Sequence, residues 1–421
     1  MTNKYSLPRG TADILPPETI LWQNIEQKVR KVLENYNYRE IRTPVFEETA
    51  LFKRSLGQTS DVVNKQLLEL VSTKEEGFAL RPEGTASIVR SYIENSLDKK
   101  ESLSKLYYIG PMFRGERPQK GRLRQFHQIG VEAIGPDSTS PYLDAEVIHL
   151  SLSILKALGL GEITLKINTL GTPQDKENFS KLLRKQLEGN ISKLCEDCQS
   201  RFERNVFRVL DCKNRDCKEV IKGLSIGTSY LSPESLAYYN QVKAALTALN
   251  ISYQECPDLV RGLDYYTHTV FEITSAGLGS QDALGAGGRY NNLVEELGGS
   301  KADAIGFALG IERIILALGE KLTAELQTLD CFLLSLSDKC TLKAFETLKS
   351  LREANISCDM NYRSASMKSL MRLADKSRAE KVLILGEDEL QKGIFTVKNM
   401  KTGEQSEIKM ENIYQEITKR I

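Results

Sequence analysis

The sequence has little that would tie it to a membrane or to a secretory route. Across its 421 residues, no apolar run approaches the length of a membrane-spanning helix. The segment Met1–Arg9 lacks the apolar core of a signal peptide. Low-complexity tracts and internal repeats are also missing, which excludes linker-like chains and repeat arrays. These absences predict a cytoplasmic protein that does not enter membranes.

Histidine is scarce as well, and neither sign of charge is in excess. The three histidines, His127, His149 and His268, are too few for a histidine-rich metal site. The net charge of +1 excludes a chain coated in basic surface, although a local basic patch can still bind nucleic acid. The length of 421 residues is too great for one compact core, so two or three domains are expected.

Against this neutral background, residues 113–132 form a local basic segment, FRGERPQKGRLRQFHQIGVE. Its loop carries one acid, Glu116, and five basic residues, Arg114, Arg117, Lys120, Arg122 and Arg124. Apolar β-like runs on both sides predict strands at about 106–113 and 126–134, joined by a loop with Pro118 and Gly121 at its turn. An excess of about +4 favours an anionic partner, while a solvated hairpin tip is the alternative interpretation of the same charges.

The end of the first of these strands has the chemistry of a phosphate site. Alternation along the strand is expected to place Arg114 and Glu116 on the same face. A guanidinium can form two parallel hydrogen bonds to a phosphate. A carboxylate two residues further on can accept a hydrogen bond from an adenine amine.

Three later runs have less distinctive patterns. Residues 259–272 read LVRGLDYYTHTVFE, in which Arg261 and Gly262 precede an aromatic, extended stretch. Residues 286–293 read AGGRYNNL, where Gly287 and Gly288 permit either a bulge or the close approach of a ligand. Residues 306–313 read GFALGIER, a strand entering a helix with small residues on one face. Taken alone, each run is also compatible with ordinary core packing.

The coarse pattern of elements divides the chain. A helix opening at Pro16-Pro17-Glu18, an extended run through Pro44, a strand–turn–helix at 78–92 and a helix at 142–158 come first. Residues 172–255 are polar, largely helical and hold four of the eight cysteines. The last ninety residues alternate strands with helices, which predicts a small helix-covered sheet. Its first helix is predicted to bury one apolar stripe, Leu342, Phe345, Leu348 and Leu351.

Together these segments resemble the class II aminoacyl-tRNA synthetases. The core of their motif 2 is F-R-x-E, matched at residues 113–116, and the continuous match to residue 132 resembles the histidyl-tRNA synthetases. LVRGLDYYTHTVFE and AGGRY resemble two signatures of that family, with Asn291 where aspartate is usual. GFALGIER is similar to motif 3, and the first helix with Pro44 takes the place of motif 1. The resemblance runs over residues 1–421.

The resemblance implies an α+β catalytic domain, a class II antiparallel sheet flanked by helices, with a mainly helical insertion and a C-terminal α/β anticodon-binding domain. The expected divisions are 1–171 for the first catalytic part with motifs 1 and 2, and 172–255 for the insertion. Residues 256–325 would form the second catalytic part, with the histidine signatures and motif 3, and 330–421 the anticodon-binding domain. Motif 1 implies a homodimer.

The implied reaction has two steps. ATP and L-histidine would give histidyl-adenylate and pyrophosphate, and the terminal ribose hydroxyl of histidine tRNA would then take the histidyl group. Such a transfer depends mainly on positioning and charge neutralisation. By resemblance, Arg261 bridges the histidine carboxylate and the α-phosphate, and Arg114 also binds the α-phosphate. Arg313 binds the γ-phosphate, and Mg²⁺ shares the charge of the pyrophosphate.

The remaining roles implied by the resemblance concern specificity. Glu83, in the Glu83-Gly84-Thr85 turn, would accept from a ring N–H of histidine, although such a turn is also typical of a plain helix start. The amino end and the pocket floor would be bound by Thr85, Gln128 and Glu132, and the walls would be Tyr265, Tyr266 and Tyr290. Glu116 would contact ATP. For tRNA, Arg117 and Gln119 would face the extra guanosine of histidine tRNA, and Arg122 would contact phosphate.

Four cysteines in the helical segment form two pairs, Cys195-x2-Cys198 and Cys212-x4-Cys217. Paired cysteines at this separation are typical of a tetrahedral zinc knuckle, although the x4 spacing of the second pair is wide. Free thiols are the alternative. Since some bacterial members of the resembled family have similar cysteines and others lack them, catalysis cannot depend on them.

Two rival interpretations remain open. The regulatory subunit of ATP phosphoribosyltransferase has a synthetase-like core and senses histidine without charging tRNA. It typically lacks the C-terminal domain and has an eroded motif 2, whereas Arg114, Glu116 and Arg313 are all present in this sequence. A tRNA-sensing module of a larger kinase would need a kinase domain, which the sequence does not contain.

Overall fold

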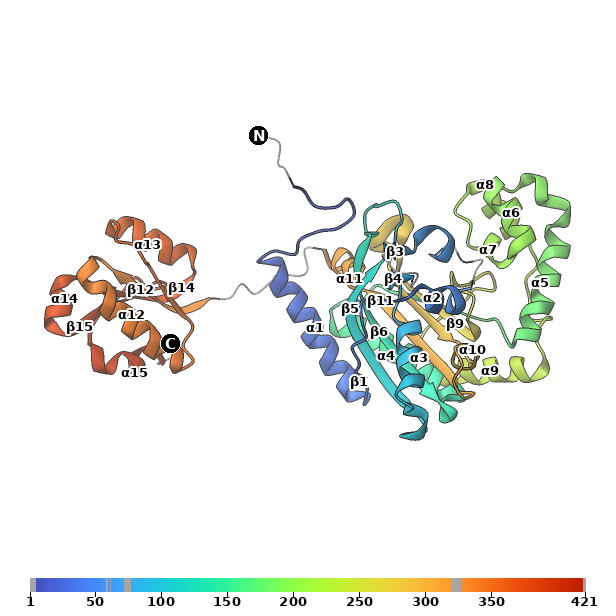
Figure 1. Cartoon of the computed structure of the whole chain (residues 1–421), viewed down its shortest axis with the longest axis horizontal. Helices are drawn as coiled ribbons and strands as arrows, with labels where there is room; N and C mark the ends of the chain where they lie inside the picture. Colours follow the sequence, from blue (N-terminus) through green and yellow to red (C-terminus); the bar gives the residue numbers. More distant parts are fainter. Residues whose placement is uncertain (1–4, 58–59, 61, 72–76, 320–327, 419–421) are drawn as a thin grey trace. The chain divides into compact units, whose positions relative to one another are not determined.

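A computed structural model describes residues 5–57, 60, 62–71, 77–319 and 328–418. The chain divides into two compact units, Met1–Thr323 and Ala324–Ile421, which are drawn in Figure 1. Among the described residues, no helix is both long enough and apolar enough to span a membrane.

The first unit is built on one large, mainly antiparallel sheet. Its order is β1 (Arg39–Glu40), β5 (Ser104–Phe113), β6 (Gln125–Gly135), β11 (Asp303–Gly310), β10 (Ala283–Arg289), β9 (Thr267–Thr274), β7 (Thr164–Thr169) and β8 (Gln254–Glu255). Only the edge pairs β1–β5 and β7–β8 are parallel. The predicted antiparallel sheet is therefore confirmed, as are the two strands that flank the basic loop.

Alternation along β6 separates the two faces of the sheet. Ile129, Val131 and Ala133 are fully buried beneath four helices. These helices are α1 (Glu18–Asn35), α4 (Pro141–Ala157), α9 (Pro233–Ala248) and α11 (Ile311–Leu318). The predicted helices at 18 and 142–158 are thus present. Because successive side chains point to opposite faces, Gln128 and Glu132 belong to the other face.

That other face is partly covered by short elements. They are α2 (Thr49–Ser55), α3 (Thr85–Glu94), α10 (Leu293–Glu296) and a three-stranded sheet in the order β2 (Phe46–Glu48), β4 (Phe78–Leu80), β3 (Leu68–Leu70). Single helical turns lie at Val62–Gln66, Leu97–Lys99, Pro136–Ser138, Glu188–Lys193 and Ala276–Gln281. The predicted strand, turn and helix at 78–92 correspond to β4 and α3.

Residues 172–255 are mainly helical, as predicted from their composition. They contain α5 (Pro173–Leu187), α6 (Glu196–Arg204), α7 (Phe207–Leu210) and α8 (Arg215–Lys222), followed by α9 and β8. Thr172 and Asp175 start α5 with a capping box, in which each side chain accepts from the other residue's backbone N–H. The last two elements return to the large sheet, where β8 pairs with β7 and α9 packs beside α4.

The second unit has a mixed five-stranded sheet in the order β13 (Cys358–Met360), β12 (Leu329–Ser335), β14 (Ala379–Leu385), β15 (Ile394–Asn399), β16 (Gln405–Lys409). Its helices are α12 (Asp338–Glu353), α13 (Met367–Lys376), α14 (Glu387–Lys392) and α15 (Ile413–Thr418), with a helical turn at Met410–Asn412. The alternating pattern predicted this α/β unit, but it did not reveal α14 or β16.

The predicted stripe of α12 is half wrong. Leu342 and Phe345 are 69% and 53% exposed. The buried positions are Cys340, Ala344, Thr347, Leu348 and Leu351. Their spacing follows the helical period, so the position on the helix and not the size of the side chain decides which residues are covered. Leu348 and Leu351 are the part of the stripe that is correct.

Candidate active site

The face of the large sheet opposite α1, α4, α9 and α11 carries very small residues at its centre. One row of residues lies in register across five strands, β5, β6, β11, β10 and β9: Tyr108, Gly130, Ala308, Ala286 and Glu272. The three central members present at most a methyl group and are flanked by an aromatic ring at one end and a carboxylate at the other. We call the three small residues Gly130, Ala308 and Ala286 the small-residue floor.

Tyr108 lies flat against two glycines. A Cβ atom at Gly84 would lie 2.3 Å from Cζ of Tyr108, and one at Gly130 would lie 2.0 Å from the same atom. Real Cβ contacts are not this close, so both positions require glycine for the ring to occupy its place. Gly84 belongs to the predicted site, whereas Tyr108 was not predicted, because a lone tyrosine in an apolar strand has no distinguishing sequence signal.

Glu132 is a buried acid among the predicted site residues. It is 1% exposed, accepts from Oγ1 of Thr85 at 2.7 Å, and accepts a hydrogen bond from the hydroxyl of Tyr290. Burial raises the pKa of Glu132 to about 8, although these two hydrogen bonds oppose the rise. A Cβ at Gly306 would lie 1.9 Å from Oε2 of Glu132, so the neighbouring strand makes room for this carboxyl group.

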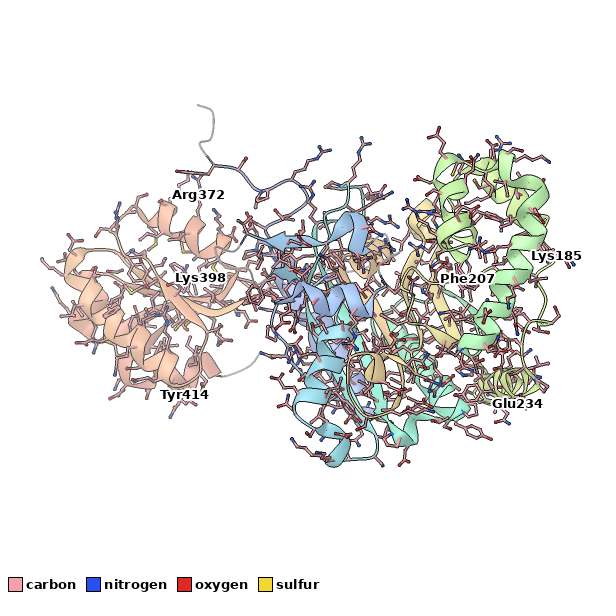
Figure 2. The ribbon with its side chains drawn as sticks, turned by 45° about the vertical axis from the view of Figure 1, so that its right-hand side comes forward. Lys185, Phe207, Glu234, Arg372, Lys398 and Tyr414 are labelled. Carbon is pink, nitrogen blue, oxygen red and sulfur yellow. The ribbon has the colours of Figure 1, made fainter. Side chains whose placement is uncertain are left out.

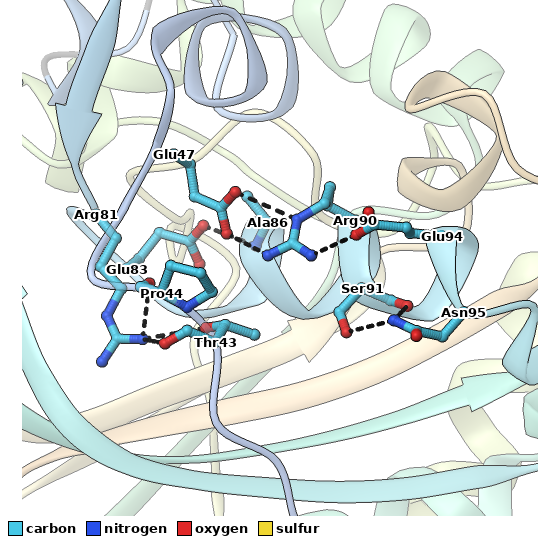
Figure 3. A network of polar contacts seen from close by, with 10 residues as sticks. All are labelled: Thr43, Pro44, Glu47, Arg81, Glu83, Ala86, Arg90, Ser91, Glu94 and Asn95. Carbon is cyan, nitrogen blue, oxygen red and sulfur yellow. Dashed lines mark hydrogen bonds and ion pairs between the residues drawn. The ribbon is translucent and has the colours of Figure 1, made fainter.

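Glu83 holds the start of α3 (Figure 3). Its two oxygens accept hydrogen bonds from the backbone N–H groups of Thr85, at 2.7 Å, and Ala86, at 2.9 Å. Figure 3 shows Glu83 together with Ala86 and Arg81. Arg81 fixes the preceding turn by donating to the carbonyl oxygens of Thr43 and Pro111, both at 3.0 Å. Burial raises the pKa of Glu83 above its usual value, and the two amides oppose that shift. The structure thus gives this carboxylate the helix-start role, while its contact with histidine stays a prediction.

Arg261 lies in the loop before β9 and pairs with Glu272. The distance from Nη1 to Oε2 is 2.8 Å, and the side chains are 19% and 22% exposed. The Nε atom of Arg261 is buried and has no protein partner, and the same holds for Oε1 of Gln128. Buried polar atoms usually have a partner, so both atoms are available to a ligand.

Only the second part of the aromatic signature, residues 259–272, belongs to a strand. Residues 259–266 form a loop, and β9 begins at Thr267, which differs from the extended run predicted here. Because Tyr265 and Tyr266 precede the strand, alternation does not separate them, and both are buried. Within β9, the pairing with β10 shifts between Gly288 and Arg289, and His268 has a φ of 42°, which marks a bulge.

The predicted tyrosines come together in one wall. The rings of Tyr265 and Tyr266 are 4.7 Å apart between centroids, and those of Tyr265 and Tyr290 are 5.6 Å apart. The Cβ of a residue replacing Gly288 would lie 2.9 Å from the ring of Tyr266. The second glycine of the AGGRY run therefore serves close packing against this aromatic wall.

Arg114 and Arg313 form the cationic part of the site with Arg122. The guanidinium of Arg114 lies 5.2 Å from the ring centroid of Phe126, and its Nε donates to the carbonyl of Pro82 at 3.0 Å. Burial lowers the pKa of Arg114 and of Arg313, and for Arg313 the charges of Arg122 and Arg114 lower it further. Mutually repelling guanidinium groups at one place favour a polyanionic ligand.

Two backbone oxygens orient Arg313. Its Nη1 donates to the carbonyl of Ala283 at 2.6 Å, and its Nε donates to the carbonyl of Gly121 at 3.2 Å. The second bond ties α11 to the basic loop. Arg313 is thereby held beside the small-residue floor by groups that carry no charge.

The basic loop has a tight end. Gln119 and Arg122 exchange backbone hydrogen bonds of 3.0 and 2.8 Å around Gly121, which has a φ of 75°. The turn therefore includes Gly121 as predicted, while Pro118 precedes it. Arg117 and Gln119 are exposed at this end, whereas Glu116 is 15% exposed and pairs with Arg122 at 3.4 Å. Both Arg114 and Glu116 lie beyond the end of β5, so strand alternation does not govern them.

Arg289, in the AGGRY run, stabilises the fold. Arg289 is 1% exposed and donates from Nε to Oδ1 of Asp144 at 2.7 Å, which forms a fully buried ion pair. Asp144 also accepts from Thr269 at 2.6 Å and from Tyr238 at 3.1 Å. Asn291, the departure from the family pattern, accepts from Arg289 and from the backbone of Ala304 at 3.3 Å. The aspartate partner lies 145 residues away and has no local signal.

A hollow lies beside Arg261, on the side of the helical segment. It has a volume of about 320 Å³ and is lined by α5, by residues 204–208 and by the loop that carries Arg261. Phe207, labelled in Figure 2, belongs to this lining and contacts Phe179 of α5 with centroids 5.2 Å apart. Beyond it, the structure gathers the four predicted cysteines, Cys195, Cys198, Cys212 and Cys217, into one cluster.

Comparison with known proteins agrees with this architecture. Residues 10–314 match a family model described as histidyl-tRNA synthetase, and residues 330–420 match one described as an anticodon binding domain. A histidine–tRNA ligase of Halothermothrix orenii is 46% identical over 417 residues, covering 98% of this chain and 99% of that protein. The crystal structure of apo S. aureus histidyl-tRNA synthetase is 39% identical with a TM-score of 0.81, covering 99% and 100% of the two chains.

A more distant structure shares the fold. An ATP phosphoribosyltransferase regulatory subunit/histidyl-tRNA synthetase from Bacillus halodurans is 23% identical with a TM-score of 0.63, covering 88% of this chain and 96% of that one. The high identity along the whole chain is with ligases, and both the synthetase and the anticodon-binding models match in the expected order. The chain belongs to the histidyl-tRNA synthetase family.

Proposed function

We propose that this chain is a histidine–tRNA ligase, which activates L-histidine with ATP to histidyl-adenylate and transfers the histidyl group to the 3′ end of histidine tRNA. The reaction class follows from family membership and from 46% identity to a curated ligase over nearly the full chain. The structural observation that carries the proposal is the small-residue floor, with Glu132 on the neighbouring strand position of β6. The cationic group of Arg114, Arg122 and Arg313 lies beside it.

The arginines would position and neutralise phosphate. Arg261 bridges the histidine carboxylate and the α-phosphate, and its pairing with Glu272 leaves Nε without a protein partner. Arg114 binds the same phosphate, and Arg313 binds the γ-phosphate. The attacking carboxylate and the leaving pyrophosphate are both anionic. Fixed cations therefore lower the activation barrier mainly by positioning the two reactants and by stabilising their charge. Glu116 accepts from the adenine amine.

The pocket of Glu132 would select histidine. Its carboxyl group, with Thr85 and the unpartnered Oε1 of Gln128, binds the ammonium end. Glu83 uses the remaining lone pairs of its carboxylate to accept from the ring N–H, since two helix amides occupy only part of its capacity. Tyr265, Tyr266 and Tyr290 enclose the ring. A pocket built on such hydrogen bonds rejects analogues that lack the polar atoms.

The cation Mg²⁺ fits the chemistry of the site. Hard oxygen donors are what this ion prefers, and Glu116 and Glu272 both lie near enough to Arg313 to raise its pKa against the stronger effect of burial. Glu116 would hold the ion together with phosphate oxygens, since Glu272 is already paired with Arg261. When bound, Mg²⁺ shares the charge of the pyrophosphate.

The remaining assignments concern tRNA and assembly. Arg117 and Gln119 would read the acceptor end from the exposed tip of the basic loop, and Arg122 would contact phosphate. The unit matched by the anticodon-binding model would bind the anticodon, and residues 172–255 would act as an insertion between the catalytic parts 1–171 and 256–325. We further propose a homodimer in the cytoplasm, with the elements of motif 1 at the interface.

The test is ATP–pyrophosphate exchange with the purified protein and each of the twenty amino acids. Exchange with histidine alone supports the proposed activation and its pocket together. In Arg261→Ala, exchange should be lost while the fold remains, and Arg372→Ala is a control because Arg372 is exposed in the second unit. Histidine binding without exchange would instead support the histidine-sensing regulatory alternative, which the full-length identity to ligases makes the weaker one.

A further inference from the structure

Four cysteines of the helical segment meet at the starts of two helices. Cys195 directly precedes α6 and Cys198 lies in its first turn. Cys212 follows α7, and Cys217 lies in the first turn of α8. Each pair therefore has one sulfur in a loop and one at a helix start.

The sulfur atoms are arranged as around a single point. All four Sγ atoms lie within 4.8 Å of one another, and those of Cys195 and Cys212 are 3.8 Å apart. Four sulfurs bound tetrahedrally at 2.3 Å from one ion would be separated by about 3.8 Å. Three of the residues are buried and Cys195 is partly buried, so the centre is shielded from solvent.

Backbone amides also contact the sulfurs. The N–H of Cys195 donates to Sγ of Cys217 at 3.2 Å, and the N–H of Asn214 donates to Sγ of Cys212 at 3.4 Å. Hydrogen bonds from the surroundings hold metal ligands in orientation and stabilise their charge. The first of these bonds also links one cysteine pair to the other.

We propose that Cys195, Cys198, Cys212 and Cys217 hold one structural Zn²⁺ ion. Four thiolates at tetrahedral spacing are a soft donor set for Zn²⁺. They leave no open position, so the ion is structural and takes no part in the chemistry. The wide x4 spacing of the second pair is accommodated because residues 213–216 turn into α8 before Cys217 is reached. The cluster has no histidine, which agrees with the scarcity of that residue.

The ion would fix the wall next to the proposed active site. Residues 204–208 lie between the two cysteine pairs and line the 320 Å³ hollow. Asn205 donates to Asp264 at 3.1 Å, and Arg208 donates to the carbonyl of Arg261 at 3.4 Å. The site thus braces the loop that presents Arg261. This consequence rests on the proposed function, whereas metal binding itself does not.

The test begins with metal content. The purified full-length chain is reduced with a phosphine, supplied with Zn²⁺, passed through a desalting column and analysed by mass spectrometry of the elements. One Zn²⁺ per chain is expected, and X-ray absorption should give four sulfur neighbours. Cobalt substitution should produce the thiolate-to-Co²⁺ charge-transfer band. Cys198→Ser and Cys212→Ser should each weaken zinc binding at least tenfold, while Cys256→Ser, outside the cluster, should bind as the wild type does.

Several results would overturn the zinc site. They are less than one-tenth of an equivalent of Zn²⁺ in the reduced chain, iron as the bound metal, or equal zinc affinity in the three variants. Removal of zinc by a chelator should lower the melting temperature and weaken histidine binding several-fold, with both restored by added Zn²⁺. An unchanged melting temperature would overturn the structural role. Loss of exchange activity in a chain that still binds zinc would count against the proposed function alone.

Discussion

Arg261 and Glu272 form an ion pair across the edge of the small-residue floor, with 2.8 Å between Nη1 and Oε2. The arginine comes from a loop, and the carboxylate comes from β9, which the sheet holds rigidly. The loop residue that we assign to the α-phosphate is therefore oriented by a strand residue. Glu272 acts as a positioning residue, since its contact is with the arginine.

The first prediction tests this dependence. Glu272→Gln should lower the rate of histidine-dependent pyrophosphate exchange about 10- to 100-fold, because a hydrogen bond to a charged group contributes about 1.5–3 kcal/mol. The loss should fall mainly on kcat, with histidine binding changed less. Glu295→Gln, at an exposed position on α10, is the matched control. Equal exchange rates in both variants would remove Glu272 from this role.

The second prediction concerns a proton. In the free protein the pKa of Glu132 is about 8, because burial disfavours its charge. At pH 7 the carboxyl group is therefore mostly protonated. An ammonium group bound beside it favours the carboxylate, so histidine binding should release up to one proton per site at pH 7, and less as the pH rises above the pKa of Glu132.

Calorimetry in buffers of different ionisation enthalpy measures this release. Glu132→Gln cannot lose a proton, so its binding enthalpy should depend on the buffer only through the titration of free histidine itself. If wild type and Glu132→Gln depended on the buffer to the same degree, the ammonium would not be bound at Glu132.

The third prediction concerns the space around Glu132. In Gly306→Ala, the new methyl group would start 1.9 Å from Oε2 of Glu132 and 2.4 Å from the carbonyl of Val131. Since one neighbour is backbone, the strand must shift, and histidine affinity should fall at least tenfold with a lower melting temperature. Gly161→Ala, whose Cβ meets nothing within 4 Å, should leave both unchanged. Full histidine affinity in Gly306→Ala would show that the strand yields without disturbing the pocket.

The fourth prediction separates the two steps of the reaction. Arg117 is exposed at the tip of the basic loop, away from the floor. Arg117→Ala should leave pyrophosphate exchange unchanged, lower kcat/KM for tRNA charging about tenfold, and reduce the salt dependence by about one phosphate contact. Lys100→Ala removes another exposed cation and serves as the control. An equal fall in exchange would place Arg117 in the activation step instead.

The fifth prediction is structural. Asp144→Asn would leave Arg289 buried without an opposite charge, which costs about 3–5 kcal/mol of unfolding free energy. The sole tryptophan, Trp22, is buried in the first unit and reports its unfolding in urea by fluorescence. Asp137→Asn, at an exposed position, should change the midpoint little. Equal midpoints would mean that Arg289 finds other partners.

Much of this fold could be predicted from local pattern. The strands around the basic loop, the first helix, α4 and the α/β order of the second unit all follow from periodicity and breakers. The predictions that failed concerned features that depend on contacts with other elements. The stripe of α12 was misjudged because large apolar side chains at 342 and 345 face solvent, while Cys340 and Ala344 are covered.

The site divides in the same way. Residues within contiguous sequence motifs, such as Arg114 and Arg261, could be identified from the motif. Their roles stay predictions. Asp144, Glu272 as the partner of Arg261, and Tyr108 could not be singled out, because their significance arises only from strand register and from contacts distant in sequence. The bulge at His268 was equally invisible, since it depends on how β9 pairs with β10.

The ring of Tyr108, packed against Gly84 and Gly130, limits which substitutions this face of the sheet accepts. Any side chain at either glycine would collide with the tyrosine at 2.3 Å or less. A substitution at either position would therefore displace the ring before it changed the surface that a ligand on this face meets, so the three residues can vary only together.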